Sequence, residues 1–131
     1  MSAADNKRLV RRYFDAMRSG DPTLPDLLAD DVTWWAPPSS PLGGVHSGKP
    51  AVVELMQSGV GLYDTSHALE VSIEQMSAEG DWVSVQMILE ARTAAGAATR
   101  NQYHFSFRVG EGRICEVREY LDTPYEQQKL F

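Results

Sequence analysis

The hydrophobic period of this chain changes near residue 69, and that change is the strongest constraint on its fold. From Asp5 to Ser19 the apolar residues follow the i, i+3, i+4 spacing of an amphipathic helix. From Leu69 onward, apolar and polar residues alternate, as they do in half-buried strands. Helical patterns therefore gather at one end of the chain and strand patterns at the other. This order predicts an α+β fold with an antiparallel sheet rather than alternating βαβ units.

The segments between these two patterns fit the same plan. The stretch from Ser39 to Gly48 is rich in Pro, Ser and Gly and is predicted to be a loop. The other expected elements are short helices at 24–28 and from 49 to about 58, and strands at 32–35, 69–74, 82–92, 99–109 and 113–123. A strongly bent antiparallel (mixed) sheet wrapped around three N-terminal helices would make a cone-shaped barrel with an internal pocket. At this length we expect one domain that spans residues 1–131.

Composition and charge exclude several classes of function. The chain has 12 Lys and Arg against 18 Asp and Glu, a formal net charge of −6, which disfavours nucleic acid and anionic membrane surfaces as partners. Its one cysteine, Cys115, excludes an internal disulfide framework. The three histidines show no ligand spacing, so we expect neither a metal nor another cofactor. The chain lacks an apolar run of membrane-spanning length and a secretory signal, so we expect a cytoplasmic protein.

Glu119 is the strongest candidate for a functional side chain. It shares one face of the last expected strand with Cys115, Val117 and Leu121, because side chains alternate along a strand. Burial of a carboxyl group among apolar residues raises its pKa toward the range of a useful general acid or base. The alternative is that this face meets a partner subunit and that Glu119 pairs with an arginine such as Arg108 or Arg118.

Several short motifs occur together along the chain. They are Arg12-Tyr13-Phe14, Gly20-Asp21, Ala29-Asp30-Asp31-Val32-Thr33, the Pro- and Gly-rich loop that ends at Gly48, and Arg118-Glu119-Tyr120-Leu121-Asp122. With these motifs, the chain from Asn6 to about Thr123 resembles the nuclear transport factor 2-like superfamily, and within it the SnoaL-like and ketosteroid-isomerase-like proteins. The resemblance implies a cone-shaped α+β barrel, usually dimeric, that holds small hydrophobic molecules.

The steroid isomerases of this superfamily supply a partial match for catalytic positions. Tyr13 stands where they carry an oxyanion-stabilising tyrosine, and Tyr103 stands where they carry a protonated carboxylic acid. Strand alternation also turns Tyr103 inward together with Phe105. Those isomerases carry their proton-abstracting aspartate directly before a proline, whereas here Ala36 precedes Pro37. The usual base is therefore missing.

The superfamily's epoxide hydrolases supply a second comparison. Glu119 takes the place of a carboxylate on their last strand, but Gln86 and Ile88 stand where they carry an arginine and a second aspartate. Trp34 and Trp35 point to opposite faces of the first strand, and the resemblance favours Trp35 for the pocket. The substrate-binding residues that we expect are Trp35, Met17, Met56, Leu62, Tyr63, Gln86, Phe105, Val117 and Leu121.

These observations predict a protein that binds a small, largely apolar molecule in an internal pocket. As an enzyme, it would perform cofactor-free acid–base chemistry of the isomerase, cyclase or lyase type on a ketone-like substrate. Glu119 would then move the proton, and Tyr13 and Tyr103 would stabilise the substrate oxygen. A non-catalytic ligand-binding or dimeric scaffold module is the alternative, and epoxide hydrolysis is less favoured. The resemblance implies a homodimer, with an interface on an apolar outer sheet face that contains Val83, Val85, Met87 and Leu89.

Overall fold

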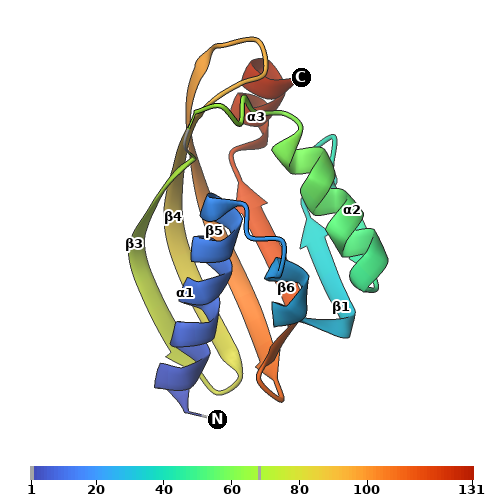
Figure 1. Ribbon diagram of the computed structural model, residues 1–131, viewed down its shortest axis with the longest axis vertical. Helices are drawn as coiled ribbons and strands as arrows, with labels where there is room; N and C mark the ends of the chain where they lie inside the picture. Colours follow the sequence, from blue (N-terminus) through green and yellow to red (C-terminus); the bar gives the residue numbers. More distant parts are fainter. Residues whose placement is uncertain (1, 68) are drawn as a thin grey trace.

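The computed structural model describes residues 2–67 and 69–131. In chain order its elements are α1 (Ala3–Ser19), the 3₁₀ helix η1 (Leu24–Leu27), β1 (Leu28–Ala36), β2 (Gly44–Ser47), α2 (Lys49–Val60), β3 (Glu70–Glu79), β4 (Trp82–Arg92), β5 (Ala98–Gly110), β6 (Arg113–Leu121) and α3 (Thr123–Leu130). Figure 1 shows a strongly curved sheet with α1 lying across its concave face, α2 beside β1, and α3 at the C-terminal end.

In the described residues the strands form one mixed sheet in the order β2-β1-β6-β5-β4-β3. Neighbouring strands are antiparallel except β1 and β6, which run parallel and place the first strand of the chain beside the last. In this register Trp34 lies opposite Val117. The expected α+β fold with a bent mixed sheet is confirmed, and β1 lies next to the strand that carries Glu119.

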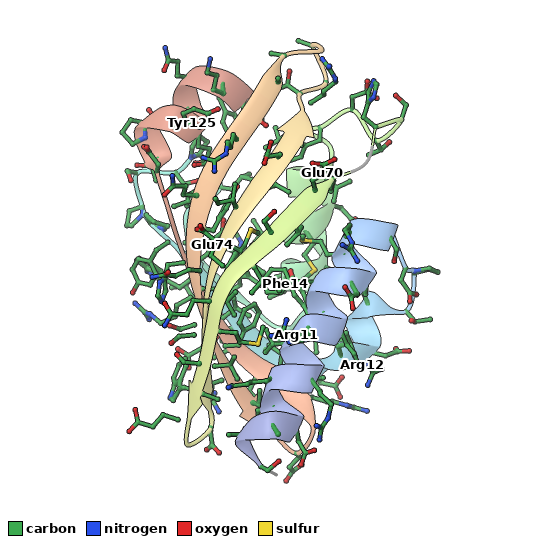
Figure 2. The ribbon with its side chains drawn as sticks, turned by 90° about the vertical axis from the view of Figure 1, so that its left-hand side faces the viewer. Arg11, Arg12, Phe14, Glu70, Glu74 and Tyr125 are labelled. Atoms are coloured by element: carbon green, nitrogen blue, oxygen red, sulfur yellow. The ribbon has the colours of Figure 1, made fainter. Side chains whose placement is uncertain are left out.

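Helix α1 supplies the apolar layer that the concave face of the sheet requires. A reciprocal capping box between Ser2 and Asp5 begins the helix, and Gly20 ends it in the left-handed conformation, with φ of 67°. The ring of Phe14 packs edge-on against Phe105 and Phe107, with centroids 5.7 and 5.6 Å away. Figure 2 shows Phe14 on the sheet side of the helix and the exposed Arg11 and Arg12 away from it.

The structure corrects the expected orientation of β4. Val83, Val85, Met87 and Leu89 were assigned to an outer, interface-forming face, but all four are buried in the core. The reason is register, because β4 pairs with β5 so that Val83 and Val85 lie opposite the buried aromatic rings of β5. The apolar face of β4 therefore packs beneath α1 and is not available to a partner subunit.

Three local features also differ from the expected ones: an additional strand, the end of the last strand, and the register within it. The stretch 39–48 contains β2, whose Val45 pairs with Trp35. The last strand ends at Leu121, because Asp122 accepts a hydrogen bond from the backbone N–H of Tyr125 and caps α3, a helix that we did not expect. A register shift in β6 lets Ile114 fill the inward position, so Cys115 is only half-buried and its expected place on the inner face is wrong.

Candidate functional site

A cavity of about 680 Å³ lies between the concave face of the sheet and the helices that cover it. Its wall takes residues from the C-terminal half of α1, from η1, α2 and α3, and from the inner faces of β1, β4, β5 and β6. Most of the lining side chains are apolar or aromatic. The volume and the lining are typical of a site for a small organic molecule.

Glu119 points from β6 into this cavity, where its surroundings perturb its acidity. The indole Nε1 of Trp34 donates a hydrogen bond of 2.9 Å to Oε1 of Glu119. Desolvation among the apolar walls raises the pKa of Glu119 from 4.5 to about 7, against the lowering effect of the Trp34 hydrogen bond and with a smaller raising effect from Glu126. Glu119 is therefore able to exchange a proton near neutral pH.

Three tyrosines surround this carboxyl group. Tyr13 is 3% exposed, and burial raises the pKa of its hydroxyl, with a further contribution from the charge of Glu119. Burial is also the largest cause of the raised pKa of the Tyr63 and Tyr103 hydroxyls, and the charge of Glu119 contributes to both. The ring of Tyr103 stacks on Phe105 with centroids 5.5 Å apart. All three hydroxyls stay protonated at neutral pH and are able to donate hydrogen bonds.

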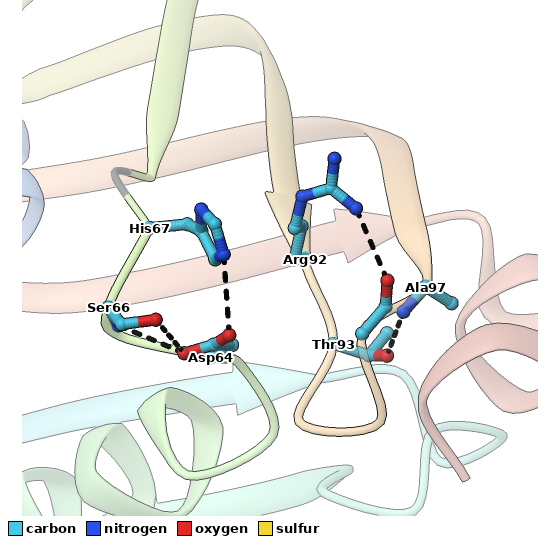
Figure 3. Close-up of polar contacts among 7 residues, drawn as sticks. Asp64, Ser66, His67, Arg92, Thr93 and Ala97 are labelled. Atoms are coloured by element: carbon cyan, nitrogen blue, oxygen red, sulfur yellow. Dashed lines mark hydrogen bonds and ion pairs between the residues drawn. The ribbon is translucent and has the colours of Figure 1, made fainter.

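Tyr63 lies in the turn after α2, and backbone pairing with the end of the sheet fixes its position. It forms an isolated antiparallel bridge with Thr93. The flanking backbone bonds run from the N–H of Asp64 to the carbonyl of Arg92, at 2.9 Å, and from the N–H of Ala94 to the carbonyl of Leu62, at 3.0 Å. Figure 3 shows the polar contacts that stabilise the two turns. Asp64 contacts Ser66 and His67, and Thr93 contacts Ala97.

Glu126 is a second carboxyl group in the cavity wall, and the sequence analysis missed it. It lies on α3, is 5% exposed, and its Oε1 has no hydrogen-bond partner. Burial raises its pKa, while a hydrogen bond with the Ser40 side chain acts in the opposite direction. The sequence Asp122-Thr123-Pro124, an N-cap followed by proline in the first helical turn, could have predicted the helix α3 but not the place of Glu126 in the cavity wall.

The structure brings together most of the side chains that the sequence singled out. Those that line the cavity are Glu119, Tyr13, Tyr103, Tyr63, Met17, Met56, Leu62 and Phe105. They come from four elements and from the turn after α2, and they meet because the sheet curves around α1. Their contribution to binding or catalysis stays a prediction.

The structure places four expected pocket residues elsewhere. Trp35 lies on the outer face of β1, where its ring packs 4.9 Å from that of Tyr120, and Trp34 takes the inward position. Gln86 is exposed, because it alternates with the buried face of β4. Val117 is fully buried in the core below the cavity. Leu121 is the last residue of β6, at the junction with α3, and does not reach the cavity wall.

The described residues show neither a group of metal-binding side chains nor a helix that could span a membrane. Across residues 2–67 and 69–131, no three His, Cys, Asp or Glu side chains form a group that could hold a metal ion. None of the helices in that part of the chain combines the length and the apolar character that a membrane crossing requires.

Comparison with known families places this geometry in context. The family model described as the SnoaL-like domain matches residues 10–117, most of the chain. The chain belongs to the SnoaL-like domain family. No curated protein sequence matches it.

Three solved structures are similar to this SnoaL-like protein along nearly its whole length. An NTF2-like protein from Burkholderia xenovorans LB400 is 26% identical, with a TM-score of 0.80, and the match covers 100% of this chain and 99% of that one. A putative SnoaL-like polyketide cyclase from Jannaschia sp. CCS1 is 17% identical, with a TM-score of 0.83 and coverage of 98% and 92%. TerC, co-crystallised with polyporic acid, is 18% identical, with a TM-score of 0.82 and coverage of 96% and 98%. At these identities the likeness supports the fold.

Proposed function

We propose that this protein binds a small, largely apolar ketone in the cavity and catalyses proton transfer on it without a cofactor. The observation that carries the proposal is Glu119, a carboxyl group with a pKa of about 7 inside an apolar cavity, beside tyrosine hydroxyls that remain protonated. The putative SnoaL-like polyketide cyclase among the similar structures supports chemistry of this class.

The chemistry follows from the charges of these groups. The Glu119 carboxylate takes a proton from the carbon next to the substrate carbonyl, and the electron pair of that C–H bond moves to the carbonyl oxygen as an enolate. A hydroxyl of Tyr13 or Tyr103 donates a hydrogen bond to the oxygen, where negative charge develops. In a β,γ-unsaturated ketone, protonated Glu119 returns the proton to the γ-carbon while the carbonyl re-forms and the double bond moves to the α,β position, which gives isomerisation. In a ketone with a leaving group on the β-carbon, the carbonyl re-forms, the α,β double bond forms, the bond to the leaving group breaks and Glu119 protonates that group, which gives elimination.

A non-catalytic ligand-binding protein is the second candidate. Ala36 before Pro37 supports it, because ketosteroid-isomerase-like enzymes carry their aspartate base there. A pure scaffold receives less support, since Glu119 accepts a hydrogen bond from an indole and lines an open cavity instead of pairing with an arginine. Epoxide hydrolysis also receives little support, because Gln86 is exposed and Ile88 shares that outer face of β4.

The test is deuterium incorporation at the carbon next to the carbonyl of cyclic ketones, with 1-tetralone as the first probe, followed by NMR in D₂O. Glu119→Gln should lower the rate by about 10²-fold or more, and Tyr103→Phe should lower it by about tenfold or more. Glu116→Gln is the matched control, because Glu116 lies on the same strand but pairs with Arg108 outside the cavity wall. Exchange that proceeds equally in wild type and Glu119→Gln would remove Glu119 from the mechanism. Ligand binding without exchange would favour the second candidate.

We also propose that the protein is a homodimer and that its outer sheet face forms the interface. Tyr120 is 42% exposed and Val45 67% exposed on that side, and the Arg118 guanidinium lies 4.6 Å from the Trp35 ring centre. An aromatic and apolar surface of this kind favours self-association. Light scattering at micromolar concentration should give twice the monomer mass, and Tyr120→Asp should give the monomer. A monomeric wild type would contradict the proposal.

A further inference from the structure

The charged groups in the cavity wall all have the same sign. Among the described residues that line it, the carboxylic acids are Asp21, Glu119 and Glu126, and none is a Lys, Arg or His. Asp21 is exposed to water, whereas Glu119 and Glu126 lie in an apolar wall that keeps the local dielectric low, so a charge on either of these two groups acts over a longer distance than it would in water. A ligand in this cavity therefore meets a negative potential.

The buried Glu126 and the partly buried Glu119 have no cationic partner in the described part of the chain. Glu119 accepts from the neutral Trp34 indole, and Glu126 has only the neutral Ser40 side chain, with its Oε1 left without a partner. Neither group takes part in an ion pair of the described residues. Buried carboxylates in proteins are normally paired with a positive charge. Without a cation, burial favours the neutral acid in both groups, so a ligand that carries a positive charge would supply the partner that allows them to ionise.

The aromatic part of the wall also favours a positively charged ligand. Five aromatic side chains line the cavity, namely Tyr13, Trp34, Tyr63, Tyr103 and Phe105. The faces of such rings carry negative partial charge and attract organic cations, most strongly when water is excluded. The ring of Phe105 is stacked between Tyr103 and Phe107, but any of the other rings that presents its face to the cavity would act in the same direction as the carboxyl groups.

We propose that the natural ligand of this cavity carries an amine, bound as its ammonium form, and that Glu126 determines this selectivity. The inference rests on the proposed use of the cavity as the ligand site and adds the charge of the ligand. Glu126 acts through its charge, which does not require direct contact with the ammonium group. An apolar ketone with an amino substituent satisfies both the proton-transfer chemistry at Glu119 and the charge preference of the wall.

Three probes that share one ring skeleton separate charge from shape: 1-tetralone, 1-aminotetralin as the ammonium ion, and tetralin-1-carboxylate. Dissociation constants are measured by titration calorimetry at pH 8, where Glu119 is mostly ionised. We expect wild type to bind the amine at least about tenfold more tightly than the carboxylate, and more tightly than the neutral ketone. Glu126→Gln should reduce the ratio of amine to carboxylate affinity by about tenfold or more.

Glu74→Gln is the matched control, because it removes the same charge from the exposed strand β3 (Figure 2). It should leave the affinity ratio unchanged, and thermal unfolding of all three proteins shows whether each is folded. If 1-tetralone binds but the amine binds no more tightly than the carboxylate, the charge inference is wrong and the proposed function stands. If the ratio survives Glu126→Gln, Glu126 is not the selecting residue. If neither 1-tetralone nor the amine binds wild type, the proposed function fails and this inference fails with it.

Discussion

Replacing Glu119 by glutamine should change how the stability of the protein depends on pH. The amide keeps an oxygen that can accept the Trp34 hydrogen bond but has no proton to titrate. In wild type the pKa of Glu119 is about 7 in the folded chain, against 4.5 as its ordinary value. Between these two values the folded chain binds more protons than the unfolded chain, so the free energy of unfolding falls as the pH rises.

The size of this effect follows from the two pKa values. Between pH 5 and pH 8, wild type should lose about 2.5 kcal/mol of unfolding free energy relative to Glu119→Gln. Urea unfolding followed by circular dichroism at the two pH values measures it. The other titrating groups are common to both proteins and cancel when the two are compared. A difference between wild type and variant that is the same at both pH values, within about 0.5 kcal/mol, would refute the desolvation of Glu119.

Three further substitutions test other parts of the structure. Trp34→Phe removes the hydrogen bond that lowers the pKa of Glu119, so NMR titration of that carboxyl group should give a midpoint above about 7; an unchanged midpoint would contradict this. Phe107→Ala empties a fully buried position and should cost about 3–5 kcal/mol in urea unfolding, whereas a loss under about 1 kcal/mol would mean that the core is not packed as described. Asp122→Ala removes the cap of α3 and should cost about 1 kcal/mol by the same measurement, and no loss would show that the cap is not formed.

The overall architecture could be predicted from the sequence, because two different hydrophobic periods mark its helices and strands. The apolar stripe of α1 and the alternation in β4 and β5 are strong enough to be read without a structure. What alternation does not give is which face of a strand is inside. For β4 the assignment was reversed, and only pairing with the aromatic residues of β5 establishes it. The same ambiguity led to Gln86 being expected in the pocket.

The candidate site was predicted in part for the same reason. Glu119 was found because its neighbours along β6 are apolar, whereas the choice between Trp34 and Trp35 followed the family resemblance and was wrong. Val32 and Ala36 lie on the same face of β1 as Trp34 and are buried. The apolar residues of β1 itself therefore indicate that Trp34 points inward. Glu126 depends on α3 folding back over the cavity, a long-range contact that no local pattern shows.

The central claim is that Glu119 is a desolvated carboxyl group in a ligand cavity. Its most direct test is the ¹³C chemical shift of the Glu119 side-chain carboxyl carbon as a function of pH, assigned by its absence in Glu119→Gln. The structure predicts a titration midpoint of about 7. A midpoint near the ordinary value of 4.5 would show that water reaches the group freely and would contradict the claim.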